Sequence, residues 1–249
     1  MSSTSVNAGA DRGPRLAKRR SRVARPSRSH VDERLLVGTA LAGIGILAAS
    51  GLARSRGPMI APFDRKVRRL VRASWWHRVP QSAWWSLGRH TRRHALAEAV
   101  AGLTGEAPTL AAGALAAAAV ARRHGPFPAL PVLVAVPLGL AAHAAVKYSV
   151  RRPRPLWARV TGKHTPSFPS GHAARGAAAA GIVGYVAARE RLAPAGVVFP
   201  LGAAVAMAGG GGRVYVDRHW ATDVIGGWAL GAAAAAVCAL WYERLRPED

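Results

Sequence analysis

Three short polar clusters in the second half of the chain carry side chains suited to binding and transferring a phosphoryl group. In the first cluster, Lys147 and Arg154 are separated by six residues. An arginine can hold two phosphate oxygens at once, and a lysine supplies a compact positive charge. Taken alone, a basic loop beside an apolar segment more often indicates membrane topology or attraction to lipid headgroups.

The second cluster is Pro169-Ser170-Gly171-His172, directly before an alanine-rich segment. Serine is a good residue to cap the start of a helix, and the free amides there attract anions. The glycine lets an anion approach the backbone closely. Taken alone, the pattern also fits an ordinary capped helix.

The third cluster contains His219 and Asp223, which are four residues apart and therefore share one face of a helix. An aspartate in this position can orient the imidazole and stabilise its cationic form, leaving the other ring nitrogen free to attack. Arg213 lies just upstream. By itself, this pair could simply tie down a helix end. Together, the three clusters predict phosphoryl transfer in which one histidine attacks and another protonates the leaving oxygen.

The elements that must position these clusters are predicted from hydropathy. The chain has 249 residues, of which 50% are hydrophobic, yet its formal net charge is +23. This combination is typical of a membrane protein whose basic residues lie in loops and tails. We therefore expect an all-α fold, a six-helix transmembrane bundle, with spans at about 35–53, 99–121, 127–146, 171–188, 194–210 and 222–242.

The segments outside the spans are strongly basic. Residues 1–34 are expected to form a disordered basic cytoplasmic tail, residues 35–242 the membrane domain, and residues 243–249 a short C-terminal tail. The tryptophans between 54 and 94 suit the headgroup level, and residues 64–72 could form an amphipathic helix on the membrane or a solvated loop. Glu106 is expected to mark a helix start at the interface. Four glycines, 209–212, are expected to end the fifth span.

Other classes of protein fit the sequence less well. A nucleic-acid binder would explain the high charge, but much of that charge lies in short loops between apolar spans. Cys238 is the only cysteine, so the chain can form no internal disulfide and none of the usual zinc spacings.

The three clusters, in this order and between membrane helices, resemble the signature of the type 2 phosphatidic acid phosphatase superfamily. The matching residues are Lys147-x6-Arg154-Pro155, Pro169-Ser170-Gly171-His172 and Arg213-x5-His219-x3-Asp223. One position departs from the pattern, because Gly212 stands where the family usually has serine. This removes one possible hydroxyl donor and none of the charged groups.

The resemblance implies a role for each residue. Lys147, Arg154, Arg213, Ser170 and the Gly171 amide would bind phosphate. His172 would be the general acid, His219 the nucleophile that forms a phosphohistidine, and Asp223 its partner. The family works without a metal or other cofactor, so neither is expected.

The expected partners are the bilayer and a lipid phosphate, with no nucleic acid. The candidate substrates are polyprenyl diphosphate, phosphatidylglycerol phosphate, phosphatidate and a prenyl-phosphate sugar phosphate, and the sequence does not choose among them. Two alternatives stay open: a vanadate-dependent haloperoxidase, which is normally soluble and larger, and a catalytically silent lipid-binding membrane protein. With six spans, the basic tail and the turns at 122–123 and 189–191 place both termini in the cytoplasm and the site at the outer face of the cell membrane. The equally basic segments 54–94 and 147–170 argue against that orientation.

Overall fold

The computed structural model describes residues 30–55, 60–73, 92–160 and 162–247. Most of the expected disordered tail and the tryptophans at 75, 76, 84 and 85 lie outside these ranges. Residues 30–34, which we assigned to the tail, instead form the first turn of a helix. The helix extends past the apolar run because its backbone hydrogen bonds do not require apolar side chains at its end.

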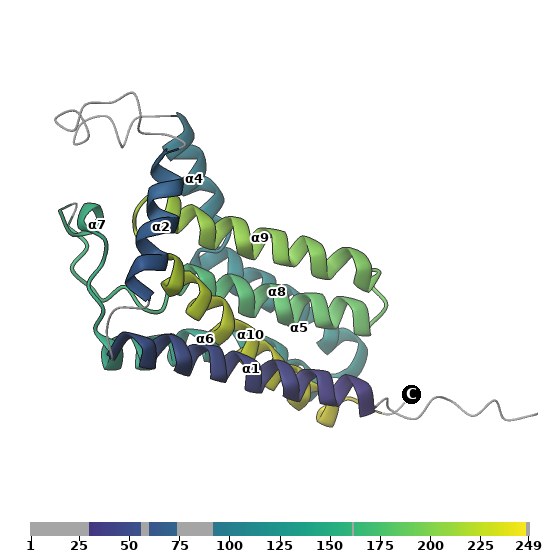
Figure 1. Ribbon diagram of the computed structural model, residues 1–249. Helices are drawn as coiled ribbons and strands as arrows, with labels where there is room; N and C mark the ends of the chain where they lie inside the picture. The colour runs from purple at the N-terminus through teal and green to yellow at the C-terminus, as the bar shows by residue number, and fades with distance from the viewer. Residues whose placement is uncertain (1–29, 56–59, 74–91, 161, 248–249) are drawn as a thin grey trace, which may run out of the picture.

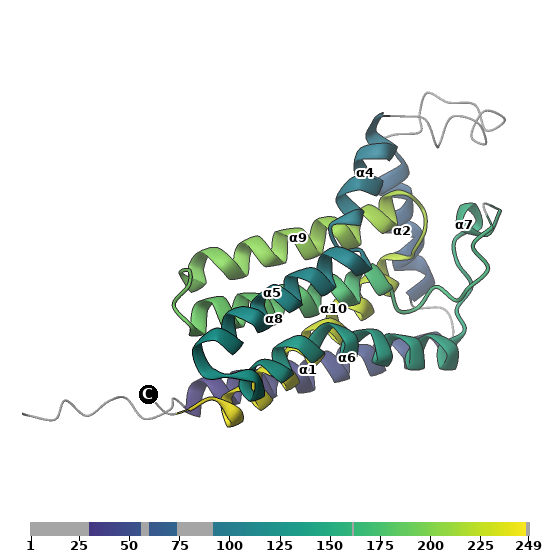
Figure 2. The same ribbon diagram turned by 180° about the vertical axis from the view of Figure 1, so that it is seen from behind.

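Every element in the described ranges is helical, in agreement with the predicted fold class. The long helices run side by side, and the shorter ones gather at one end of the bundle (Figures 1 and 2). The long helices are α1 (His30–Ser55), α5 (Glu106–His124), α6 (Pro126–Val150), α8 (Gly171–Arg189), α9 (Ala195–Tyr215) and α10 (Ala221–Leu245). The short ones are α2 (Ile60–Ala73), α4 (Arg92–Gly102) and α7 (Leu156–Val160).

The surface of the bundle is apolar, as a bilayer requires. Leu115 and Phe127 are both 72% exposed, and Leu41 is 64% exposed. Within the described ranges, four helical segments are long and apolar enough to cross a membrane: His94–His124, Pro126–Val150, Ala195–Tyr215 and Ala221–Leu245. The chain is therefore a multi-pass helical membrane protein. The six-span count, which adds α1 and α8, remains a prediction.

Small residues bring α8 and α10 into backbone contact. A Cβ at Gly231 would lie 2.1 Å from the carbonyl oxygen of Ala174, and one at Gly227 would lie 2.5 Å from that of Ser170. Close approach through small residues is how helices associate in lipid. Here it joins the start of α8 to the start of α10, and these two helix starts carry the second and third polar clusters.

The glycine run at 209–212 does not end a helix, so this expectation was wrong. α9 continues through it to Tyr215. In a membrane, helical hydrogen bonding outweighs the entropic cost of glycine. The run also gives packing space, since a Cβ at Gly209 would lie 2.2 Å from Thr104 Oγ1 and one at Gly212 would lie 3.0 Å from the Ala97 carbonyl oxygen.

The predicted span at 99–121 is interrupted by a turn at residues 103–105, after which α5 begins at Glu106. Glu106 is exposed and lies in the first turn of α5, as expected for a residue that marks a helix start. The predicted helix at 64–72 is present as part of α2. The last span reaches Leu245, beyond the expected end at 242.

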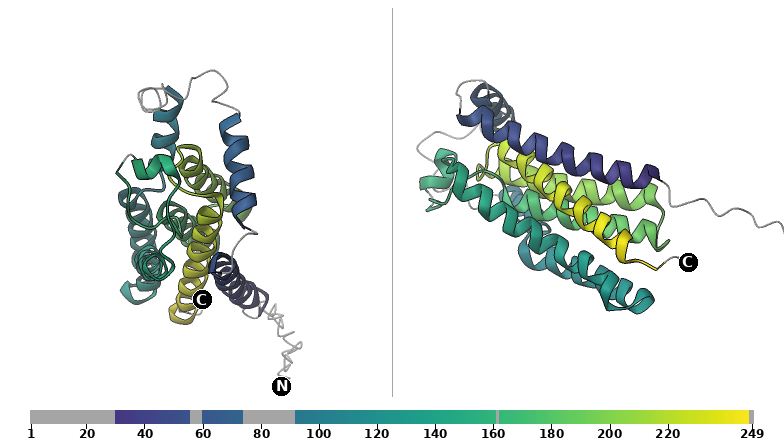
Figure 3. Two further views of the ribbon diagram at one scale, coloured as in Figure 1. Left: turned by 60° about the vertical axis from the view of Figure 1, so that its left-hand side comes forward. Right: turned by 90° about the horizontal axis from the view of Figure 1, so that it is seen from below.

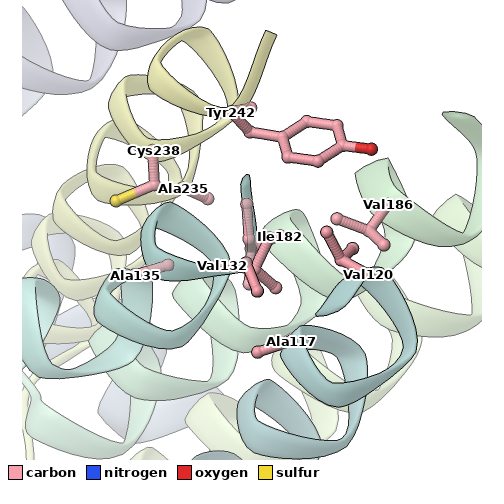
Figure 4. Close-up of a cluster of buried hydrophobic side chains, with 11 residues drawn as sticks. Ala117, Val120, Val132, Ala135, Ile182, Val186, Ala235, Cys238 and Tyr242 are labelled. Carbon is pink, nitrogen blue, oxygen red and sulfur yellow. The ribbon is translucent and has the colours of Figure 1, made fainter. Parts of the chain in front are cut away.

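The apolar core lies between α5, α6, α8 and α10 (Figure 4). Val120, Val132 and Ile182 are completely buried there. Tyr242 adds the largest buried side chain, and its ring meets that of Tyr185 edge to face at 6.4 Å between centroids. Figure 3 shows the termini of the described chain at the same end, away from α2, α4 and α7.

Candidate active site

The three polar clusters meet at the end of the bundle that carries the short helices (Figures 1 and 3). Lys147 lies in the last turn of α6, and Arg154 lies in the loop that follows. Ser170 caps α8, and Arg213 lies in the last turn of α9. His219 is in the loop between α9 and α10, and Asp223 is in the first turn of α10.

His219 is held between a guanidinium and a carboxylate. Its Nε2 atom lies 3.1 Å from Arg154 Nη1, and its Nδ1 atom lies 3.5 Å from Asp223 Oδ2. Only 6% of the His219 side chain is exposed. A guanidinium has donors and no acceptor, so Nε2 must offer its lone pair to Arg154. The proton of the neutral ring therefore sits on Nδ1, toward Asp223.

Electrostatics keep the His219 ring neutral. Burial lowers the pKa of this imidazole from its ordinary value of 6.5, and the charges of Arg154 and Arg213 lower it further. The hydrogen bonding and charge of Asp223 act in the opposite direction without reversing the shift. A neutral imidazole whose Nε2 carries no proton is the form that can act as a nucleophile.

Arg154 is fixed by backbone carbonyls. Its Nε atom donates to the Thr165 carbonyl oxygen at 2.8 Å, and Nη1 donates to that of Arg218 at 2.8 Å. A third bond runs from Nη2 to the Pro166 carbonyl oxygen at 3.3 Å. These neutral acceptors orient the guanidinium without cancelling its charge, so the charge stays available to an anion.

The second cluster is tied directly to the third. The Ser170 amide donates to the Asp223 carbonyl oxygen at 2.8 Å. The Ser170 side chain is fully buried, and its Oγ makes no hydrogen bond to any described residue. A buried hydroxyl without a partner is costly, and a phosphate oxygen would satisfy it.

His172 and Gly171 face two basic groups that the sequence interpretation did not assign. Arg175 Nη2 lies 3.4 Å from His172 Nδ1. A Cβ at Gly171 would lie 3.1 Å from His143 Nε2, so any other residue there would crowd this imidazole. Both groups had a sequence signal, because His143 precedes Lys147 by four residues and Arg175 follows His172 by three.

Arg213 is paired with an acidic residue from α4. Its Nη1 atom donates to Glu98 Oε2 at 2.7 Å. The Nε atoms of Arg213 and Arg175 are buried and have no hydrogen-bond acceptor in the described part of the chain. The site thus has more cationic donors than acceptors, the arrangement that favours an anionic ligand.

The Gly212 departure from the signature has a packing reason. At this position α9 meets α4, and a Cβ would lie only 3.0 Å from the Ala97 carbonyl oxygen. A serine would require one of the two helices to shift.

Across the described residues, no group of three or more His, Cys, Asp and Glu side chains could hold a metal ion.

The fold and site thus define a multi-pass helical membrane protein with a cationic cluster at one end of its bundle. Residues 128–247 match the model of the PAP2 superfamily. This part of the chain belongs to that superfamily, as the three-part signature predicted.

A solved structure with the same fold is the first transmembrane PAP2 type phosphatidylglycerolphosphate phosphatase from Bacillus subtilis. Its TM-score is 0.63 at 20% sequence identity, over 84% of this chain and 96% of that chain. No curated protein sequence matches this chain.

Proposed function

We propose that this chain is an integral-membrane lipid phosphatase that works through a phosphohistidine on His219. The observation that carries the proposal is the position of the His219 ring between the Arg154 guanidinium and the Asp223 carboxylate. Nε2 presents its lone pair to the phosphate-binding guanidinium of Arg154, while Nδ1 carries its proton toward Asp223. A phosphate bound by Arg154 would lie next to the nucleophilic atom.

In the first step, His219 Nε2 forms a bond to phosphorus as the bond from phosphorus to the lipid oxygen breaks. His172 gives its proton to that leaving oxygen. Asp223 stabilises the positive charge that develops on the His219 ring, without taking its proton.

In the second step, water attacks phosphorus and loses a proton to His172 as the bond from phosphorus to Nε2 breaks. Inorganic phosphate leaves, and both histidines return to their starting states. Throughout, the cationic groups and Ser170 Oγ would bind the equatorial phosphate oxygens, where charge gathers in the transition state. The cationic groups are Lys147, Arg154 and Arg213.

The proposed substrate is the phosphomonoester or diphosphate of a lipid. The apolar exterior supports this proposal, because the candidate residues lie at one end of a membrane bundle, where a headgroup could reach them. The solved neighbour is named for one such lipid, phosphatidylglycerol phosphate. The test is a panel of lipid phosphates in detergent, with release of inorganic phosphate as the readout and His219→Ala as the control.

The panel also distinguishes a phosphatase from the main alternative, a catalytically silent lipid-binding protein. Release that exceeds the His219→Ala control supports the phosphatase, and equal release would support the alternative. Activity that survives a chelator would support a metal-free mechanism. Competitive inhibition by vanadate is expected, because its trigonal-bipyramidal form resembles the transition state.

We further propose that the site faces the outside of the cell. Lys163 and Leu192 are both exposed, and they lie in loops at opposite ends of the bundle. In a background with Cys238 replaced, an impermeant thiol reagent on intact cells should label Lys163→Cys and spare Leu192→Cys. The reverse pattern would place the site in the cytoplasm.

A further inference from the structure

The amphipathic helix α2 contributes one buried acidic residue to the site end of the bundle. Asp64 is only 2% exposed, although its neighbours Phe63 and Arg65 are both exposed. A buried carboxylate is stable only where donors and positive charge surround it. The contacts of Asp64 therefore indicate what it does.

Asp64 binds the first turn of α10. Its Oδ1 accepts the amide hydrogen of Thr222 at 3.0 Å, and its Oδ2 accepts the hydroxyl of Thr222 at 2.7 Å. The cap residue of α10 is Trp220, whose side chain has no oxygen to offer. Asp64 thus caps from another helix, and its charge suits the positive end of the α10 dipole.

Asp64 also shares a guanidinium with Asp223. Arg152 Nη2 donates to Asp64 Oδ2, and Arg152 Nη1 donates to Asp223 Oδ1 at 2.7 Å. The other Asp223 oxygen, Oδ2, accepts the Trp220 amide at 2.9 Å and lies 3.5 Å from His219 Nδ1. A continuous chain of contacts therefore runs from Asp64 through Arg152 and Asp223 to His219.

We infer that Asp64 is a positioning residue for phosphoryl transfer, acting through Arg152 on the orientation and charge of Asp223. The inference rests on the proposed function. With Asp64 present, the positive charge of Arg152 is shared between two carboxylates. Without it, Arg152 would pair with Asp223 alone. Asp223 would then stabilise the His219 imidazolium less well.

The chain offers a matched control on the same helix. Arg68 of α2 binds Asp217 through two bonds, Nε to Oδ1 at 2.7 Å and Nη2 to Oδ2 at 2.6 Å. This pair also joins α2 to the loop between α9 and α10, but it does not contact Asp223. If α2 only needed to be docked on this loop, then loss of either pair would have the same effect.

The experiment compares the purified wild type with Asp64→Asn, Asp64→Glu and Arg68→Gln on a lipid phosphate that the wild type hydrolyses. We expect Asp64→Asn to lower kcat by about 30-fold and to leave KM within about threefold, the size of effect seen when partners that orient a catalytic group are lost. Asp64→Glu should recover part of kcat. Arg68→Gln should keep about half of the wild-type kcat or more, because Arg68 bonds to Asp217 and not to Arg152 or Asp223.

The pH profile gives a readout that a purely structural role would not change. The acid limb of kcat/KM should move to lower pH in Asp64→Asn, because a weaker Asp223 partner lowers the pKa of His219. The variant keeps the side chains of the described charged and titratable groups that act on His219, so that only the pairing of Asp223 is altered. These groups are Asp223 on α10, Arg154 in its loop, Arg213 on α9, His143 on α6 and His172 on α8.

A kcat within about twofold of wild type and an unmoved acid limb would overturn the inference, as would equal losses in Asp64→Asn and Arg68→Gln. If Asp64→Asn does not fold, Arg152→Lys serves instead, since lysine cannot hold both carboxylates in a fixed fork. It should show the same loss of kcat, and wild-type behaviour would overturn the inference. A wild type that is inactive on every lipid would refute the proposed function itself, a result distinct from an active wild type with an unimpaired variant.

Discussion

The two ends of the bundle differ in how their buried polar groups are hydrogen-bonded. At the end away from the site, Glu190 is buried and accepts bonds from Tyr242, His124, Arg123 and Arg246. At the site end, buried donors on Ser170, Arg175 and Arg213 have no acceptor within the described ranges.

This difference separates stability from function. A satisfied network around one acid can stabilise the fold, as Glu190 does beside the apolar core. Cationic groups that crowd together with few acceptors destabilise the site until an anion binds. Substitutions at the two ends should therefore affect different measurements.

The largest effect is expected at the nucleophile. His219→Ala should lower kcat by about 10³-fold or more and leave the detergent-solubilised protein folded. Asp223→Asn should also be severely slow, because the ring loses its orienting carboxylate. Phosphate release and thermal unfolding of the same preparations would check this. A His219→Ala variant that keeps a tenth of wild-type kcat would show that another residue is the nucleophile.

The next largest effect is expected in the glycine run of α9, and it is on stability. Gly209→Ala should destabilise the protein by about 1–3 kcal/mol, because its Cβ would overlap Thr104. Gly211→Ala is the matched control, since a Cβ there meets nothing within 4 Å. It should be neutral or stabilise by up to about 1 kcal/mol. Thermal unfolding of the two variants side by side tests the assignment, and equal stabilities would contradict the packing account.

Glu190→Gln should reduce stability by about 1–2 kcal/mol and leave kcat within about twofold of wild type. Burial opposes ionisation of Glu190, but hydrogen bonds from Tyr242 and His124 lower its pKa from 4.5 to about 2. The stability that this depressed pKa contributes is present above pH 4.5 and is lost as the pH falls toward 2. The gap in melting temperature between wild type and variant should therefore narrow over that range. If the difference in melting temperature stays constant as the pH falls to about 2, the charge of Glu190 is not what stabilises the fold.

The smallest effect concerns pH and activity at the site end. His219 acts in its neutral form, and its pKa is lowered chiefly by burial. The acid limb of kcat/KM should therefore lie below pH 6.5, the ordinary value for histidine. A pH profile on a soluble short-chain lipid phosphate measures this limb. An acid limb clearly above pH 6.5 would mean that Asp223 raises the pKa of His219 by more than burial and the cationic groups lower it.

The sequence predicted the parts of the site that depend on local spacing. The pair His219 and Asp223 was found from its spacing of four residues, although His219 lies in the loop before α10 and not on a helical face. Ser170 was found because helix starts have a residue preference. The same spacing argument applied to Lys147 and His172 would also have found His143 and Arg175. The apolar spans followed from hydropathy.

The residues missed by the sequence analysis depend on contacts between distant parts of the chain. Asp64 is 158 residues from Thr222, and nothing in the local sequence distinguishes it from an exposed acid on a basic helix. Glu98 reaches Arg213 across 115 residues. The glycine run was misjudged for the same reason, because its packing partner Thr104 lies in the turn between α4 and α5. Such contacts require the fold before they can be recognised.

The most direct test of the central claim is to trap the covalent intermediate. Wild-type protein, mixed with a lipid phosphate and quenched rapidly under alkaline conditions, should carry a phosphoryl group on the peptide that contains His219. The group should be stable to base and lost in acid, and it should be absent from His219→Ala. Phosphorylation of another residue, or turnover without any phosphorylated enzyme, would contradict the account.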